Sequence, residues 1–343
     1  EVIFGNARQA GVGPNVARQI AIRSGLRHEV PAYTVNQACG SGIRSIINAA
    51  DDIRLGNIGM ALVGGTESMS NTPFLLTRAR WGLRMGDQEI TDGMIRDGFL
   101  CPLADEMMGA TAETLAERYE ISRDEQDEYA VTSQRRAAEA WEKGWFDAEV
   151  VPVEVAGRKG SVKVEKDEHL RPDTSVEKLR KLPPVFRDHG TVHAGNSSGI
   201  TDGAASLLVA GKDAVDRHGL KPVARLVAYS QVGVDPKIMG IGPVPATKVI
   251  LEENRISLDE IDLIELNEAF AAQVISCDRE LGLDRDRLNV HGGSIALGHP
   301  IGCTGARITT TLVHAMNRHG KKLGLATLCI SGGMGLALLL ERA

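Results

Sequence analysis

The chain is poor in aromatic residues and in cysteine, and neither charge is in large excess. Phe, Trp and Tyr make up 4% of its 343 residues, and the five cysteines include no Cys-x-x-Cys pair. This spacing argues against a structural zinc site and a disulfide framework, so we expect reduced thiols and a cytoplasmic protein. A net charge of -6 offers no basic field for nucleic acid or anionic lipid. No apolar run approaches the roughly 20 residues that span a bilayer, so we expect no membrane association.

Glycine is abundant, with 38 residues, and it marks an internal repeat. Near the start, the turn ACGSG (38–42) is followed by an amphipathic segment (43–56) and by MALVGGTESM (60–69). Near the end, GHPIGCTG (298–305) is followed by a second amphipathic segment (306–320) and by LGLATLCISGGMG (323–335). Both copies predict a turn, a helix and a strand, so we expect an α/β fold built from two similar halves. The nearly unbroken apolar runs are typical of parallel strands covered on both faces.

The length of the chain favours two domains, or two halves around one interface. We place the first half at 1–69 and 200–221, an inserted loop domain at 70–199, and the second half at 222–343. Ahead of its glycine-rich turn the second half has a strand and a helix that the first half lacks. If the halves are duplicates, we expect a strand and a helix to be missing before the first residue; a first half that is naturally shorter is the alternative.

Within the inserted region, two features have local interpretations. Ser122 and Glu125 form a capping box, which predicts a helix that runs to Lys143 and ends at Gly144. The charged run at 158–181 mixes both signs, as solvated surfaces do, although a phosphate-binding edge would give a similar pattern.

Cys39 and His299 occupy equivalent turns of the two copies. Cys39 lies between a strand-like segment (32–36) and an amphipathic helix, where the partial positive charge of the helix N-terminus favours a thiolate. The duplication is expected to bring His299 towards Cys39, and an imidazole there could take the thiol proton. A small buried cysteine at a glycine turn, or a structural histidine, would give the same local pattern.

Two further positions lie at strand ends. Cys329 ends the last core strand before a glycine-rich run, and a thiol pKa near 8.5 suits proton exchange with a carbon acid. Asn267 and Glu268 follow the strand-like DLIEL, at the edge where α/β folds keep ligand sites. The alternatives are a buried strand cysteine and a simple helix cap.

Taken together, VNQACGSG, NEAF, GGSIALGHPIGCTGAR and CISGGMG resemble the signature segments of the thiolase family, in order and in spacing. The resemblance extends over nearly the whole chain. It implies a duplicated βαβαβαββ fold, layered as an α-β-α-β-α sandwich, with a loop domain that binds coenzyme A (CoA). It also implies an acyltransferase that condenses two acetyl-CoA molecules reversibly and cleaves 3-ketoacyl-CoA. CoA and acyl-CoA are then substrates, and no metal or redox cofactor is required.

The same resemblance implies roles for particular residues. Cys39 would be the acylated nucleophile, His299 its activating group, and Cys329 the acid and base at the α-carbon. Asn267 would anchor a water that forms one oxyanion hole with His299, and the backbone N–H groups of Cys39 and Ser331 would form a second. The implied contacts to CoA or the acyl chain are Met108, Arg171, Phe186, Ala194, Ser198 and Met239.

The stretch RWGLRMGD (80–87) resembles the loop through which biosynthetic thiolases pair dimers into tetramers, so we expect a homo-oligomer. Two departures from the family affect the expected specificity and turn geometry: Met107 stands where biosynthetic members have His, and Ser331 where Gly is usual. A longer-chain 3-ketoacyl-CoA thiolase of fatty-acid β-oxidation is one alternative. A decarboxylating ketoacyl synthase and a non-catalytic thiolase-like protein that binds acyl-CoA or lipid are two others.

Overall fold

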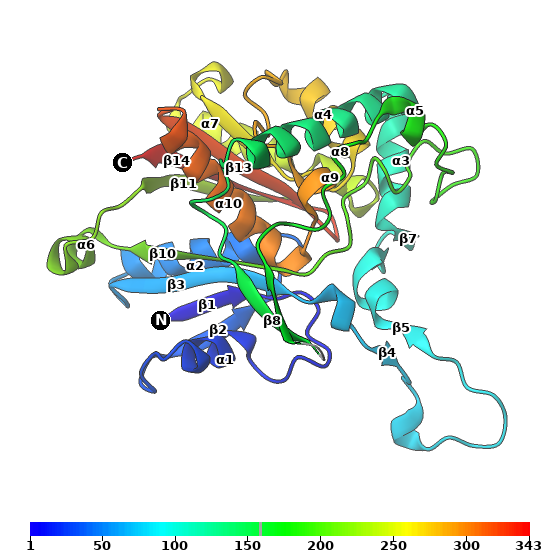
Figure 1. Ribbon diagram of the computed structural model, residues 1–343, viewed down its shortest axis with the longest axis horizontal. Coiled ribbons are helices and arrows are strands. Elements are labelled where there is room, and N and C mark those ends of the chain that lie inside the picture. Colours follow the sequence, from blue (N-terminus) through cyan, green and yellow to red (C-terminus); the bar gives the residue numbers. More distant parts are fainter. Residues whose placement is uncertain (158–159) are drawn as a thin grey trace.

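Two four-stranded sheets form the centre of the computed structural model, which describes residues 1–157 and 160–343 (Figure 1). The first sheet has the order β10-β3-β1-β2 and the second has the order β11-β14-β13-β12. The strands of the first sheet are β1 (Val2–Gly5), β2 (Ala32–Val35), β3 (Met60–Glu67) and β10 (Gly203–Ala210). Those of the second are β11 (Ala224–Gly233), β12 (Leu263–Leu266), β13 (Leu323–Ile330) and β14 (Met334–Arg342).

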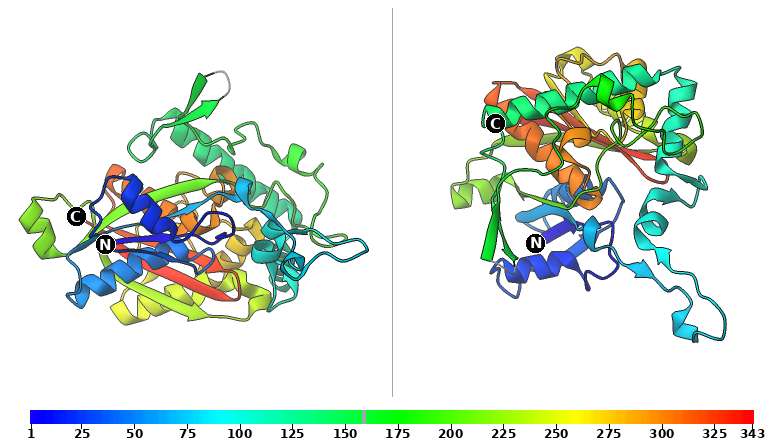
Figure 2. Two further views of the ribbon diagram at one scale, coloured as in Figure 1. Left: turned by 90° about the horizontal axis from the view of Figure 1, so that it is seen from below. Right: turned by 45° about the vertical axis from the view of Figure 1, so that its right-hand side comes forward.

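Helices cover both sheets and fill the space between them (Figures 1 and 2). Helix α1 (Val16–Arg23) packs on β1 and β2 on the outer side of the first sheet. Helices α2 (Ser41–Arg54) and α10 (Ile301–Arg318) contact each other and both sheets. On the far side, α7 (Pro243–Asn254) packs on the second sheet and on α8 (Ala271–Leu281). The predicted α-β-α-β-α sandwich of two similar halves is therefore confirmed.

The strand directions correct one expectation. β3 is parallel to β1 but antiparallel to β10, and β13 is parallel to β12 but antiparallel to β14. The apolar runs of these strands indicate burial on both faces. Because strands of a mixed sheet between two helix layers are buried in the same way, the runs do not distinguish parallel from antiparallel strands. The apolar runs therefore predicted correctly that helices cover both faces of the sheets. They predicted the directions of β1, β3, β12 and β13 correctly, but not those of β10 and β14.

The second glycine-rich segment differs in part from the expectation. Gly298 lies in the loop before α10, with φ 97°, whereas α10 begins at Ile301 and so includes Gly302 and Gly305. They are explained by close packing and not by a turn. A Cβ added at Gly42 would lie 2.4 Å from the backbone nitrogen of Ala306, and one at Gly305 would lie 2.3 Å from that of Ile43. Such distances leave no room for a side chain, so the two glycines allow α2 and α10 to cross in direct backbone contact.

The inserted region packs on α8, beside the second sheet, and sends an arm away from the body (Figure 2). Its main helices are α3 (Met108–Arg118) and α4 (Arg123–Glu142), and both hydrogen bonds of the predicted capping box at Ser122 are present. Strands β8 (Val153–Gly157) and β9 (Gly160–Val164) form an exposed hairpin; residues 158 and 159 of the charged run lie outside the described residues. The shorter elements of the chain are η1 (Met69–Asn71), β4 (Phe74–Leu75), η2 (Ala79–Trp81), β5 (Thr91–Asp92), η3 (Ile95–Phe99), β6 (Leu100–Cys101), β7 (Glu106–Met107), β8 (Val153–Gly157), β9 (Gly160–Val164), α5 (Val176–Leu179), α6 (Lys212–His218), η4 (Pro236–Ile241), η5 (Leu258–Glu260) and α9 (Ser294–Leu297).

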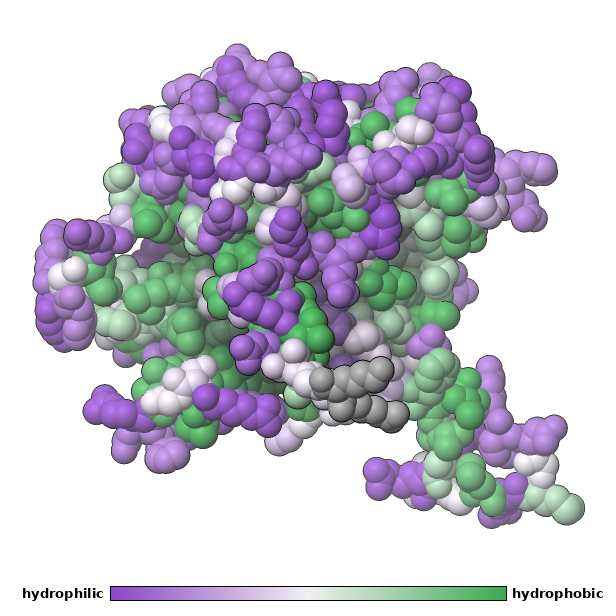
Figure 3. Space-filling view, viewed as in Figure 1, coloured by the Kyte–Doolittle hydropathy of each residue, from purple (hydrophilic) through white to green (hydrophobic). Residues whose placement is uncertain are grey.

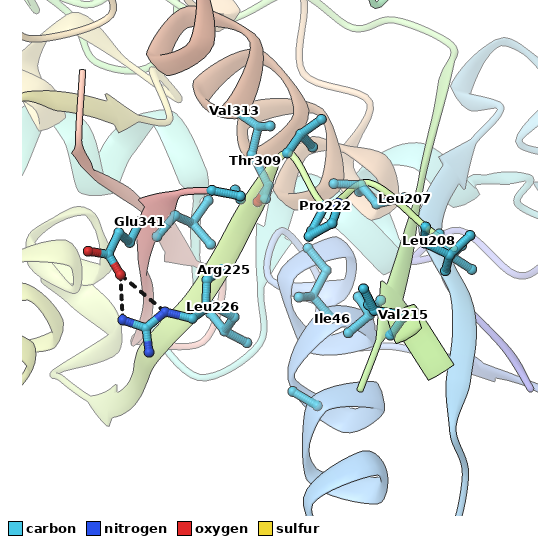
Figure 4. A pocket seen from close by; sticks show the side chains of 18 of the residues that line it. Ile46, Leu207, Leu208, Val215, Pro222, Arg225, Leu226, Thr309, Val313 and Glu341 are labelled. Carbon is cyan, nitrogen blue, oxygen red and sulfur yellow. Dashed lines mark hydrogen bonds and ion pairs between the residues drawn. The ribbon is translucent and has the colours of Figure 1, made fainter. Parts of the chain in front are cut away.

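The two sheets differ at one edge. In the second sheet β11 covers the outer edge of β14, whereas in the part of the chain that the structure describes no strand covers the outer edge of β10. A groove of about 860 Å³ follows this edge, and it is lined by β10, α2, α6, α10 and the start of β11 (Figure 4). Hydrophobic surface lies beside α6 in the space-filling view (Figure 3). None of the predicted catalytic residues lines the groove. Among the described residues, no helix is long and apolar enough to cross a bilayer.

Candidate active site

Cys39 lies at the junction between β2 and α2, immediately before the N-cap residue Gly40. Its neighbour Ala38 has φ 45°, a left-handed conformation that costs free energy for a residue with a side chain. Among the described residues, Cys39 is the only partly accessible cysteine; the other four cysteines are buried. Its side chain packs against a small cluster that includes Met69 and Ile301, so it faces the start of α10.

The ionisation of Cys39 corrects the expectation of a thiolate. Burial raises the pKa of Cys39 above its ordinary value, and this effect outweighs the hydrogen bond from the Ser331 backbone and the charge of Arg8, both of which lower it. The helix N-terminus therefore does not by itself ionise the thiol. At neutral pH Cys39 carries its proton, so a nucleophilic role requires a base.

His299 is positioned by the loop that precedes α10. Its backbone N–H donates to the Gly199 carbonyl at 3.1 Å, and its Nδ1 lies 2.6 Å from the Thr304 hydroxyl oxygen. The Thr304 hydroxyl donates to the Pro300 carbonyl at 3.0 Å, so it can accept a hydrogen from Nδ1. This network assigns the tautomer with the proton on Nδ1 and leaves Nε2 free to accept a proton.

The environment keeps this imidazole neutral. Burial, with smaller contributions from the charges of Arg307 and Arg8, lowers the pKa of His299 to about 3. The resting site thus combines a protonated Cys39 thiol with a neutral imidazole.

Asn267 follows β12 and joins the same group. Its Nδ2 lies 3.5 Å from His299 Nε2, and its Oδ1 accepts a 2.6 Å hydrogen bond from the Ser294 hydroxyl. Both Asn267 and Ser294 are buried. The amide nitrogen of Asn267 therefore faces Nε2 of His299.

Cys329 and Ser331 enter the site from the end of β13. The backbone N–H groups of Ser331 and of Cys39 itself each act to lower the pKa of the Cys39 thiol, which places Ser331 beside this sulfur. Cys329 is 1% exposed, and its burial, together with the neighbouring Cys39, raises its pKa well above the ordinary value. The structure thus places Cys39 beside Cys329 and Ser331, and His299 beside Asn267. The charge of Arg8 acts on both Cys39 and His299, and Cys39 packs against Ile301, two residues after His299.

The six residues expected to contact CoA or the acyl chain fall into two groups. Met108 and Met239 lie in the buried cluster that contains Cys329, and Phe186 packs against it, with its ring 6.1 Å from that of Phe270. Ser198 is also near the site, since its N–H donates to the Ala269 carbonyl and the next residue accepts from His299.

Ala194 and Arg171 are exposed. The Arg171 guanidinium donates hydrogen bonds to the carbonyl groups of residues 168–170, so it stabilises the loop in which it lies.

Several polar residues around the site were not predicted. The Glu67 carboxylate, 2% exposed, accepts hydrogen bonds from the backbone of Ala7, Arg8 and Gly302, which ties the first sheet to the start of α10. The Glu268 carboxylate accepts from Tyr129 and Ser133 of α4 and thereby fastens the inserted region to the core. Glu268 lies in the NEAF segment, but the sequence did not show which element it would bind. Among the described residues, no group of three or more His, Cys, Asp or Glu could hold a metal ion.

A duplicated layered α/β fold, with two thiols, an imidazole and an amide gathered where its halves meet, defines an acyltransferase. The chain belongs to the thiolase family. The model of the thiolase N-terminal domain matches residues 1–213, and that of the thiolase C-terminal domain matches residues 220–342.

Similar proteins support this assignment. An acetyl-CoA acetyltransferase of Escherichia coli (strain K12) is 50% identical over 343 residues, which cover 100% of this chain and 87% of that protein. The crystal structure of the Bacillus anthracis acetyl-CoA acetyltransferase has a TM-score of 0.97 and 45% identity, and covers 100% of this chain and 86% of that one. The structure of human mitochondrial 3-ketoacyl-CoA thiolase in complex with CoA has a TM-score of 0.95 and 43% identity, with 100% and 86% covered.

Proposed function

We propose that this thiolase is an acetyl-CoA C-acetyltransferase that works through an acyl-Cys39 intermediate. The observation that carries the proposal is the approach of Asn267 Nδ2 to His299 Nε2 at 3.5 Å, in a site that also holds the thiols of Cys39 and Cys329. Two relatives support the choice of substrate, since the similar proteins from E. coli and B. anthracis carry the name acetyl-CoA acetyltransferase.

In the direction of cleavage, His299 Nε2 takes the proton of the Cys39 thiol as the sulfur attacks the 3-keto carbon of the substrate. The oxyanion that forms is stabilised by hydrogen-bond donors. The bond between the α- and β-carbons then breaks, and acetyl-CoA leaves as an enolate that Cys329 protonates at the α-carbon. The acyl group remains on Cys39 as a thioester.

The second half-reaction returns the enzyme to its starting state. The Cys329 thiolate takes the thiol proton of a second CoA, whose sulfur attacks the thioester carbonyl. The Cys39 sulfur leaves and recovers its proton from His299. In condensation the same steps run backwards, and Cys329 removes the α-proton of acetyl-CoA. Both directions use CoA and acyl-CoA as substrates and require no metal or redox cofactor.

For CoA, we propose Met108, Phe186, Ser198 and Met239 as the contacts near the reactive end, with Ala194 and Arg171 further out on the surface. The proposal is supported by the burial of both methionines in the cluster around Cys329. It is also supported by the similarity to the human thiolase whose structure contains CoA. We further propose that the protein is a cytoplasmic homo-oligomer of fatty-acid metabolism, an expectation with which the five free thiols are consistent.

A longer-chain 3-ketoacyl-CoA thiolase is the second candidate. It is favoured by the similarity to human mitochondrial 3-ketoacyl-CoA thiolase and by Met107, a half-buried apolar residue at the start of α3. Comparing kcat/KM for acetoacetyl-CoA with that for 3-ketooctanoyl-CoA separates the two. A preference for acetoacetyl-CoA supports the acetyltransferase, and a preference for the longer substrate supports the second candidate.

The central test is to incubate the protein with acetyl-CoA and to locate the acetyl group by peptide mass spectrometry. We expect one acetyl group on Cys39, none in the Cys39→Ala variant, and an unchanged adduct in Cys303→Ala, which alters a buried cysteine of α10. An adduct on another residue contradicts the mechanism. Acyl-CoA binding without any adduct or turnover would instead indicate a non-catalytic acyl-CoA-binding protein.

A further inference from the structure

The orientation of the Asn267 amide decides what this side chain offers the reaction. With its nitrogen towards His299, Asn267 presents N–H donors to the site; with the amide turned over, it presents an acceptor. The Nε2 atom of His299 is itself an acceptor in the assigned tautomer, so only the first orientation avoids two facing acceptors. Which orientation holds depends on the partners of the Asn267 oxygen.

Ser294 supplies that partner. The Ser294 hydroxyl donates to Asn267 Oδ1 at 2.6 Å, and neither side chain is more than 1% exposed. A serine hydroxyl has a single hydrogen, and it could in principle be directed elsewhere. The direction of this hydrogen bond therefore depends on what else contacts the Ser294 oxygen.

Arg307 fixes the direction. Its Nη2 donates to the Ser294 oxygen at 2.8 Å, and a guanidinium can only donate. The Ser294 oxygen is thus occupied as an acceptor, and its hydrogen remains for Asn267. The Nη1 atom of Arg307 lies 3.6 Å from Oε2 of Glu265, which precedes Asn267 by two residues. The donors run in one direction, from Arg307 through Ser294 to Asn267.

We propose that Ser294 and Arg307 are positioning residues that hold the Asn267 amide with its nitrogen facing the reaction centre. Neither side chain is assigned a contact with the substrate, and both act through Asn267. Ser294 and Arg307 belong to GGSIALGHPIGCTGAR, the segment that also carries His299, so one stretch of chain provides the imidazole and orients its partner. The inference rests on the proposed function, because it concerns the acyl transfer at Cys39.

A double-mutant cycle tests the proposal. The rate of thiolysis of acetoacetyl-CoA is measured for the wild type, Ser294→Ala, Asn267→Ala and the double variant. We expect Ser294→Ala to lower kcat about tenfold to a hundredfold with little change in KM, as loss of an outer partner does, and to have almost no further effect in the Asn267→Ala background. Equal losses in both backgrounds, or no loss in the wild-type background, overturn the proposal.

Two further variants separate positioning from folding. Ser276→Ala removes a buried hydroxyl that donates to the Ala272 carbonyl within α8, and it should retain the wild-type kcat. Ser294→Thr keeps a hydroxyl and should recover more activity than Ser294→Ala; a folded Thr variant no more active than the Ala variant contradicts the proposal. The acetyl adduct on wild-type Cys39 is scored separately, so failure of the proposed function is recognised by its absence.

Discussion

His299 Nδ1 lies 2.6 Å from the hydroxyl of Thr304, one turn into α10. Since that hydroxyl also donates to the Pro300 carbonyl, the pair fixes the imidazole tautomer and the plane of the ring together. His299, the proposed base, is therefore oriented by Thr304 of α10, the helix that directly follows the His299 loop.

Replacing Thr304 with Val tests this relationship, because Val has the same shape but no hydroxyl. We expect kcat to fall about tenfold to a hundredfold, since the imidazole is then free to adopt the other tautomer. Thr310→Val is the matched control: its hydroxyl also donates to a carbonyl within α10, that of Ala306, and it does not contact His299. The kcat of the two variants is measured by steady-state kinetics. Equal kcat values for Thr304→Val and Thr310→Val would contradict the role of Thr304.

The raised pKa of Cys39 predicts how its reactivity depends on pH. Only the thiolate is alkylated, so the rate of modification of Cys39 by iodoacetamide should continue to rise above neutral pH and should show no plateau near pH 7. The charge of Arg8 lowers the pKa of Cys39, so Arg8→Met should move the profile to higher pH. Arg23→Met, which removes an exposed charge at the end of α1, should leave it unchanged. A plateau at neutral pH would mean that the thiolate forms without a base.

The protonation state of Cys39 could not be predicted from the sequence. The position of Cys39 before an amphipathic helix was readable from its glycines, but its ionisation was not, because the desolvation that dominates the pKa comes from elements far apart in the chain. The same holds for Ser294 and Arg307. Both stand inside the segment that identified His299, yet no spacing rule shows which buried hydroxyl an amide oxygen will meet.

The fold was more predictable than the polar network. Periodicity and the internal repeat indicated helices and strands of both halves, since burial on one or two faces leaves a direct pattern in the sequence. Strand direction and the start of α10 were not determined by that pattern. The glycines at 302 and 305 predicted a turn, whereas the structure uses them for close contact, and both uses require the same absent side chain.

The projecting arm around residues 76–90 predicts assembly. Trp81 is 86% exposed and Met85 is fully exposed, and large apolar side chains in this state are typical of interfaces. We expect the wild type to have the mass of a tetramer in light scattering, and the double variant Trp81→Glu/Met85→Glu to have the mass of a dimer. Val162→Glu, on the exposed β8–β9 hairpin, serves as the control and should not change the mass. An unchanged mass for the arm variant would show that this arm does not join subunits.

Glu149 predicts a pH-dependent loss of stability. Burial raises the pKa of Glu149 to about 7, and its Oε2 accepts a hydrogen bond from Thr311 of α10. Since the unfolded carboxyl ionises at lower pH, the folded state binds more protons, and its stability should decline as pH rises from about 4.5 to about 7.

Glu149→Gln removes that decline. We expect the free energy of unfolding to rise by about 1–3 kcal/mol at pH 8 and to change little at pH 5, as measured by urea denaturation. Glu142→Gln, at an exposed position near the end of α4, is the control and should show no such difference between the two pH values. A stabilisation that is equal at pH 5 and pH 8 would contradict the assigned ionisation.

The crossing of α2 and α10 should be the least tolerant contact in the fold, because it is made by backbone against backbone. A methyl group at Gly42 or Gly305 would lie 2.3–2.4 Å from a backbone nitrogen of the opposite helix, so the helices must separate. The loops that precede these helices carry Cys39, before α2, and His299, before α10, which are the proposed nucleophile and base. We therefore expect Gly42→Ala and Gly305→Ala each to lower the unfolding free energy by about 3 kcal/mol or more and to reduce kcat even where the protein remains folded.

Gly59→Ala, at an exposed position where the nearest atom to a new Cβ is 3.7 Å away, should change neither quantity measurably. Wild-type kcat in a folded Gly305→Ala protein would show that the separation of the two catalytic loops does not depend on this crossing.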